Sequence, residues 1–231
     1  MIVDSMTLQE IHRELHDDYL NTVGTLDNRL RKFGSAVLKT SRYPIRRHYE
    51  CRSIQKRNRF WVMLTAIKRG EWNDPVIDYY CVFDRPEGLF CAVLDPRGGN
   101  TFVFPPHFFS RYRERVLGGS GMTGPDLIKY FVNRIWMWSF MLLSEDRRKG
   151  VASMDEVLSK ESIDFMAYHP DGVMFGERTD NIYLIKTIVT FDMLFRDQKE
   201  LLDDLFELYF NSICTAYPEK IKDYIMDLEN G

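Results

Sequence analysis

The sequence has little of what marks secreted, membrane-spanning or metal-stapled proteins. It contains four cysteines in 231 residues, without a CxxC or Cys/His pair, which argues against a zinc knuckle or a disulfide framework. The longest uncharged apolar stretch, residues 135–144, is half as long as a membrane-spanning helix requires. The first twenty residues carry six charged side chains and no apolar block, so we expect no secretory signal and a cytoplasmic location.

Sequence motifs of several large enzyme classes are missing as well. The chain has no G-x-x-x-x-G-K-[ST], no G-x-S-x-G and no H-E-x-x-H, and its one G-x-G-x-x-G, at residues 119–124, follows a predicted helix rather than the strand that a dinucleotide-binding motif requires. P-loop nucleotide hydrolysis, Rossmann redox chemistry, α/β-hydrolase chemistry and zincin chemistry therefore have no sequence support. No cofactor is predicted.

The patterns that are present predict an α+β fold in a single domain, residues 1–231. With 45% hydrophobic residues, the chain is long and apolar enough to bury a substantial core. Short connections between the β-rich runs favour an antiparallel meander, and no Pro/Gly/Ser-rich linker separates the two sets of strands. The expected segments are an N-terminal helical segment at 1–40, the meander at 45–104, helices at 105–145, strands at 162–190 and C-terminal helices at 191–231.

Two helical segments have features of their own. The N-terminal apolar stripe predicts one long amphipathic helix or two in sequence, opened by a capping box of Thr7 and Glu10. Gly24 and Gly34 are the expected places where it bends or stops. A second helix, beginning at residue 123 or 124 and running to about Leu143, is apolar on almost every side from residue 135 onward, which predicts burial or a partner interface.

Charge is distributed unevenly although the net charge is only -3. Residues 29–69 contain thirteen Lys/Arg and one acid, whereas residues 192–231 contain ten acids and four bases. Arginines interleaved with aromatic residues are typical of surfaces that combine phosphate contacts with base stacking. The same pattern also arises in strands that place arginine on the wet side and aromatics in the core. The candidate nucleic-acid-binding residues are Arg42, Arg46, Arg47, Arg52, Arg57 and Arg59.

A second candidate site begins at His107, just after Pro105 and Pro106. At helical spacing, His107, Arg111 and Arg115 lie along one edge of a helix. The helix dipole and the arginines disfavour the imidazolium, and a neutral histidine is a usable base. Two arginines could hold a phosphate and stabilise charge that develops on it, which is the requirement of metal-free RNA cleavage. The alternative is that His107 caps the helix and the arginines form ion pairs.

This His-x-x-x-Arg-x-x-x-Arg helix, followed by antiparallel strands, resembles some members of the ribonuclease-toxin fold that groups barnase, colicin-type RNases and RelE-like toxins. The resemblance covers nine residues, 107–115, and a loose order of elements. It implies a metal-free ribonuclease. The chain departs from that family in size, because those domains are small and lack an N-terminal meander.

Lys186 is the fourth candidate catalytic residue. It interrupts one apolar face of a predicted strand that is apolar on both sides, so it must reach solvent, a carboxylate or a ligand. If it met His107 across the fold, the two would supply a cation and a base to one phosphate. The alternative is that it extends past the strand end to solvent.

His12 and His16 lie one helical turn apart. A metalloprotease helix needs Glu directly after the first histidine, and Arg13 occupies that position. The pair alone could bind a metal weakly, but a solvated helix face explains it better. No metal site is predicted.

The sequence therefore predicts a protein that binds RNA or another phosphate-bearing partner through an arginine-rich surface, with ribonuclease activity as an extension. The rival is a non-catalytic protein-interaction module. It would use the N-terminal stripe and the apolar helix at residues 136–143 for homodimerisation or for binding a protein partner.

Overall fold

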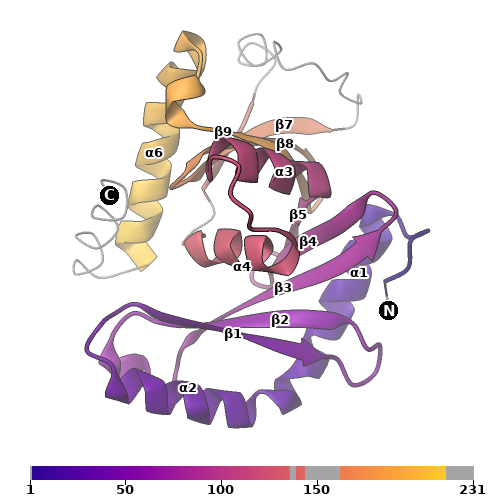
Figure 1. Cartoon of the computed structure of the whole chain (residues 1–231), viewed down its shortest axis with the longest axis vertical. Helices are drawn as coiled ribbons and strands as arrows, with labels where there is room; N and C mark the ends of the chain where they lie inside the picture. The colour runs from indigo at the N-terminus through magenta and orange to yellow at the C-terminus, as the bar shows by residue number, and fades with distance from the viewer. Residues whose placement is uncertain (1, 136–138, 144–161, 217–231) are drawn as a thin grey trace. The chain divides into compact units, whose positions relative to one another are not determined.

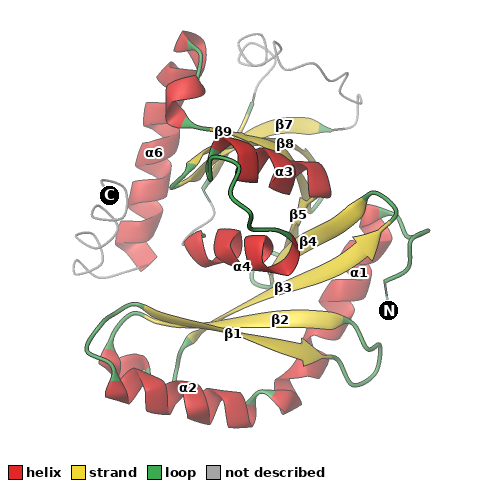
Figure 2. Cartoon of the chain, viewed as in Figure 1, coloured by secondary structure: helices red, strands yellow, loops and turns green. Residues whose placement is uncertain are grey.

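The computed structural model describes residues 2–135, 139–143 and 162–216, and within them the α+β class is confirmed (Figure 1). The chain divides into two compact units, Met1–Pro106 and His107–Gly231. Helices and antiparallel strands occur in both units (Figure 2). That the whole chain behaves as a single domain stays a prediction.

The first unit opens with the predicted amphipathic stripe, which forms two α-helices rather than one. α1 (Leu8–Asp18) and α2 (Asp27–Lys39) are joined by the 3₁₀ helix η1 (Tyr19–Thr25), which contains Gly24. The capping box is present: Thr7 Oγ1 accepts from the Glu10 amide at 3.2 Å, and Glu10 accepts from the Thr7 amide at 2.7 Å. The apolar stripe is core, with Ile11, Leu15, Leu26, Phe33 and Val37 buried.

The prediction that Gly34 bends or stops the helix is wrong. Gly34 lies inside α2, and its missing side chain serves a close approach, because a Cβ there would lie 2.4 Å from the carbonyl oxygen of Trp72. Trp72 follows the 3₁₀ helix η2 (Arg69–Glu71) in the loop between two strands. A helical glycine that touches another backbone cannot be distinguished from a helix breaker in the sequence.

We therefore expect Gly34→Ala to lower the free energy of unfolding by about 1–2 kcal/mol, because the collision outweighs the better helix propensity of alanine. Gly24→Ala is the matched control, since nothing lies within 4 Å of its Cβ position. Urea denaturation followed by far-UV circular dichroism measures both variants. Equal midpoints for the two would refute the close approach.

Five strands of the first unit form the predicted meander. β1 (Ile45–Arg52), β2 (Arg59–Ala66), β3 (Val76–Arg85), β4 (Gly88–Asp95) and β5 (Asn100–Phe104) pair antiparallel in chain order. α1 and α2 lie along one face of this sheet (Figure 1), where the ring of Tyr19 packs 5.2 Å from that of Tyr79.

The register also explains why the cysteines are free thiols. Cys81 is opposite Ala92 and Cys91 is opposite Val82, so the two cysteines point to opposite faces of the β3–β4 hairpin. Both are buried and form no disulfide, and the same holds for Cys51. Burial raises the pKa of Cys81 to about 12, which makes its thiol unreactive.

The second unit contains α3 (Pro106–Arg115), α4 (Gly124–Arg134) and an antiparallel sheet in the order β9-β8-β7-β6. Its strands are β6 (Phe140–Leu142), β7 (Ile163–His169), β8 (Gly172–Thr179) and β9 (Ile182–Val189), followed by the 3₁₀ helix η3 (Phe191–Met193) and α6 (Arg196–Ala216). The three predicted strands are confirmed. The part of the predicted C-terminal helices beyond residue 216 lies outside the described residues. No helix in the described residues is long and apolar enough to cross a membrane.

The prediction that a helix runs to about Leu143 is wrong. α4 ends at Arg134, Ile135 is extended, and β6 pairs with β7. An apolar run without a polar face has no period that tells a helix from a buried strand, which is why the sequence misled here. The interaction helix predicted at residues 136–143 is thus a strand at Phe140–Leu142, and residues 136–138 lie outside the described residues.

Candidate nucleic-acid interface

Three of the six candidate arginines share one face of the five-stranded sheet. Arg52 is directly opposite Arg59 in the β1–β2 pair, and Arg46 lies six residues before Arg52 on the same side of β1. The register puts Trp61 on this face opposite Glu50, and Tyr80 opposite Trp61. We call this group the arginine face: Arg46, His48, Arg52, Arg59, Trp61 and Tyr80, of which Tyr80 is buried and supports the others from below.

The aromatic members of the arginine face form a connected group. The rings of Trp61 and Tyr80 lie nearly parallel, with centroids 6.1 Å apart, and His48 Nδ1 lies 3.0 Å from the Tyr80 hydroxyl. The guanidinium carbon of Arg59 lies 5.9 Å from the Trp61 ring centroid, within cation–π range. These contacts give the indole a fixed orientation beside a cation.

Two acidic residues lie on the same side of the sheet as the arginines. Arg59 Nε pairs with Glu50 at 2.8 Å, and the two side chains are 41% and 39% exposed, so the pair is screened and weak. Asp78 lies opposite Met63 on the same face. Burial raises the pKa of its carboxyl overall, although Arg46 and Arg97 act to lower it. The face therefore offers local donors rather than a strong positive field.

The other three candidate arginines are placed differently. Arg47 points to the opposite face of β1, and its Nη1 donates to the Arg46 carbonyl at 2.9 Å. Arg42 is exposed before the strand, and Arg57 is exposed in the β1–β2 loop with a positive φ of 55°. The structure thus brings together Arg46, Arg52 and Arg59 and leaves the rest outside this group.

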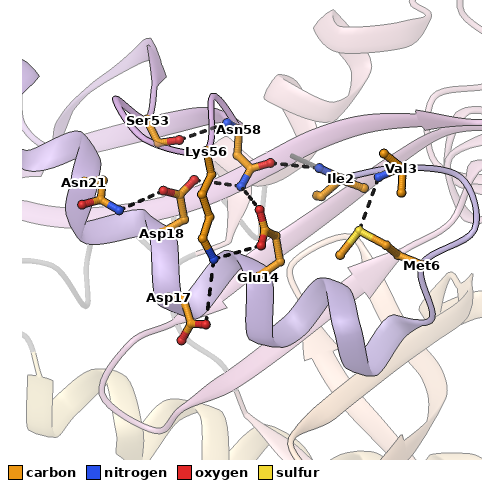
Figure 3. A network of polar contacts seen from close by, with 10 residues as sticks. All are labelled: Ile2, Val3, Met6, Glu14, Asp17, Asp18, Asn21, Ser53, Lys56 and Asn58. Atoms are coloured by element: carbon orange, nitrogen blue, oxygen red, sulfur yellow. Dashed lines mark hydrogen bonds and ion pairs between the residues drawn. The ribbon is translucent and has the colours of Figure 1, made fainter.

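A polar network fixes the loop from which Arg52 and Arg59 emerge (Figure 3). Asn58 donates through Nδ2 to Glu14 at 3.0 Å and to Asp18 at 2.8 Å, and the Lys56 ammonium lies 2.9 Å from Glu14. Burial acts to raise the pKa of Glu14, but hydrogen bonds, those of Asn58 and Lys56 among them, lower it to about 2. α1 and the β1–β2 loop are therefore joined by charged hydrogen bonds at neutral pH.

In the second unit, the arginines of the predicted catalytic helix contact a neighbouring strand. Arg111 Nη1 donates to the Lys186 carbonyl at 3.3 Å, and Arg115 Nη1 donates to the Ile188 carbonyl at 2.7 Å and to Thr187 Oγ1 at 3.1 Å. His107 is exposed in the first turn of α3. Both guanidinium groups thus have structural hydrogen bonds to β9, and their phosphate-binding role stays a prediction.

Lys186 lies at an irregularity of β9. The β8–β9 register passes from Phe175–Thr187 to Gly176–Ile185, which leaves Lys186 as the extra residue of a β-bulge. Its ammonium lies 3.1 Å from Glu177 Oε2. The expectation that this lysine meets solvent, a carboxylate or a ligand is thus met by a carboxylate, and its proximity to His107 stays a prediction.

A polar cluster around Asp171, within the described part of the second unit, was not found by sequence reasoning. Asp171 accepts from the Tyr112 hydroxyl at 2.5 Å and from Arg134 through Nε at 2.7 Å and Nη2 at 2.5 Å. His169 is buried, stacks on Phe131 at 4.9 Å and accepts the Asp171 amide at Nδ1. The only sequence signal was His169-Pro-Asp-Gly, which indicated a turn. His169 and Asp171 are largely buried and Arg134 is 25% exposed, and we interpret the cluster as structural.

The surfaces required by the rival function are used inside the protein or lie outside the described residues. The N-terminal stripe is the core of the first unit, and the apolar helix is a strand where it is described. Trp136 and Trp138 fall outside the described residues. Partner binding through these segments has no support from the described contacts.

No protein-family model matches the chain, and comparisons with curated proteins and with solved structures gave no match either. Function can therefore be inferred only from the residues and their arrangement.

Proposed function

We propose that the protein binds single-stranded RNA, or a chemically similar phosphate-bearing chain, through the arginine face. The observation that carries the proposal is the register that places Arg46, Arg52 and Arg59 on one side of the sheet with Trp61 and Tyr80. Arginine forks bind phosphate oxygens, and an indole offers a stacking surface to any base. An extended sheet suits a splayed single strand better than a duplex.

The size of the arginine face supports a short binding site. Arg46 and Arg52 are six residues apart on one strand, a separation of roughly 20 Å at 3.3 Å per residue. This length corresponds to the lower end of the range of about 4–16 nucleotides bound by compact single-strand-binding folds. Because Glu50 and Asp78 lie on the same face, contacts with individual phosphates rather than long-range attraction would provide the affinity.

We expect the triple variant Arg46→Gln/Arg52→Gln/Arg59→Gln to bind a fluorescent single-stranded RNA at least 30-fold more weakly. The slope of log affinity against log salt concentration should fall by about 2, because about 0.7 counterion is released per phosphate contact on a single strand. Trp61→Leu should weaken binding by about 5- to 100-fold through lost stacking, with the slope unchanged. Fluorescence anisotropy over a range of salt concentrations measures both effects.

Arg47→Gln is the matched control, because Arg47 belongs to the same strand and points to the opposite face. It should change affinity by less than threefold. If Arg47→Gln weakens binding as much as a single substitution on the arginine face, or if no RNA is bound at any salt concentration, the proposal fails.

Ribonuclease activity at His107 is a separate proposal that the same samples address. Cleavage of the RNA in chelator, abolished by His107→Ala, would support it. Intact RNA with both proteins would remove it and leave the binding proposal standing.

A further inference from the structure

His12 and His16 form a compact pair against the start of β5. Their rings are 4.5 Å apart on α1, and both are half-buried rather than on a solvated helix face. His12 Nδ1 lies 2.8 Å from Thr101 Oγ1, and His16 Nε2 lies 3.1 Å from the same oxygen. His16 Nε2 is also 3.2 Å from the Asn100 carbonyl oxygen. Two imidazole nitrogens thus converge on two neutral oxygens.

The three hydrogen-bond distances at this position are also compatible with neighbouring ligands of one metal ion. With metal–ligand bonds of about 2.1 Å, neighbouring ligands of an octahedral ion lie about 3.0 Å apart. The three nitrogen–oxygen distances at this position, 2.8, 3.1 and 3.2 Å, lie around that value. Water would take the remaining positions of a bound ion.

We propose that His12, His16, Asn100 and Thr101 bind a divalent late transition metal ion of the Ni²⁺, Cu²⁺ or Zn²⁺ class. Imidazole ligands select these ions over Mg²⁺ and Ca²⁺, which prefer carboxylate oxygens. The described residues hold no group of three or more His, Cys, Asp or Glu side chains suited to a metal. The proposed site therefore depends on two neutral oxygens of β5 in addition to the two imidazoles. The oxygens are about 85 residues away in sequence, and the histidine spacing alone did not reveal them.

Several neighbouring groups surround the histidine pair. Burial, His16 and Arg13 each lower the pKa of His12. The ring of Tyr19 lies 6.2 Å from that of His16, and Arg13 and Asp17 are exposed at neighbouring helix positions. Asp95, at the end of β4, is engaged by the Gly98 amide and the Asn100 side chain.

The site is independent of the arginine face. Thr101 is opposite Leu94, which is opposite Tyr79, so Thr101 belongs to the helix-covered face of the sheet. Bound metal would cross-link α1 to β5 within the first unit and stabilise the unit in proportion to metal occupancy.

The experiment is a titration of the untagged full chain with NiCl₂ at pH 7.5 by isothermal calorimetry. We expect one ion per chain with micromolar affinity. His12→Gln and His16→Gln should each weaken binding at least tenfold, and Thr101→Val should weaken it severalfold. His107→Gln, which removes an exposed histidine of the second unit, is the matched control and should leave the affinity unchanged.

Thermal unfolding keeps the proposal testable if a variant is less stable. Ni²⁺ should raise the unfolding midpoint of the wild type and not that of His12→Gln/His16→Gln. Millimolar or absent binding by a folded wild type, or equal affinity in the wild type and both single glutamine variants, would overturn the proposal and show that the pair only hydrogen-bonds to Thr101.

Discussion

Replacing Asp171 by Asn should lower the free energy of unfolding of the second unit by about 2–3 kcal/mol. Asp171 accepts a bidentate pair from Arg134 and the Tyr112 hydroxyl, and its side chain is 11% exposed. Asparagine preserves the shape but removes the charge, which leaves the guanidinium, only 25% exposed, without its counterion. Breaking a fully buried pair costs about 3–5 kcal/mol, and we take a lower value because Arg134 is partly solvated.

The measurement is hydrogen exchange of the β7–β9 amides, which reports the opening of this unit alone. Asp180→Asn is the matched control, because Asp180 lies exposed in the turn between β8 and β9 and asparagine tolerates its φ of 51°. It should change stability by less than about 0.5 kcal/mol. The double variant Asp171→Asn/Arg134→Gln should lose less free energy of unfolding than the sum of the losses of the two single variants. Additive losses, or equal losses for Asp171→Asn and Asp180→Asn, would mean that the pair contributes little.

The Asp171 cluster also shows where sequence reasoning reaches its limit. Tyr112 belongs to α3, Arg134 ends α4, and His169 and Asp171 flank the turn between β7 and β8. No local signal connects these three places, because their meeting depends on how two helices pack against a sheet. By contrast, the capping box of Thr7 and Glu10 and the turns of the meander are local chemistry, and they were predicted correctly.

The arginine face was partly accessible to prediction. Positions 46 and 52 differ by an even number, so one strand must place both arginines on the same side and Arg47 on the other. The addition of Arg59, Trp61 and Tyr80 depends on the β1–β2 and β2–β3 registers, which turn lengths alone did not fix. Lys186 illustrates the same limit, because alternation predicted its face but not the bulge that makes it the extra residue of β9.

Acidification should destabilise the second unit between about pH 6.5 and pH 4, by up to about 3 kcal/mol. His169 is 1% exposed, and burial lowers its pKa to about 4, although the nearby Asp171 carboxylate acts to raise it. The unfolded chain, with a histidine pKa near 6.5, then takes up a proton that the folded protein resists. The stabilising contribution is therefore complete above pH 6.5 and is lost progressively as the pH falls toward 4. Protonation also removes the Nδ1 lone pair that accepts the Asp171 amide at 3.1 Å.

Urea denaturation at pH 7 and pH 4.5, compared between the wild type and His169→Gln, isolates this contribution. The His169→Gln variant should be less stable than the wild type at pH 7, but glutamine does not titrate. The difference in free energy of unfolding between the two proteins should therefore narrow by most of those 3 kcal/mol at pH 4.5. His107→Gln, which changes an exposed histidine, should keep the wild-type pH dependence. A gap between the wild type and His169→Gln that stays constant from pH 7 to pH 4.5 would mean that folding does not lower the pKa of His169. The adjacent Asp171 carboxylate would then compensate fully for burial, and the cluster would contain two charge pairs rather than one.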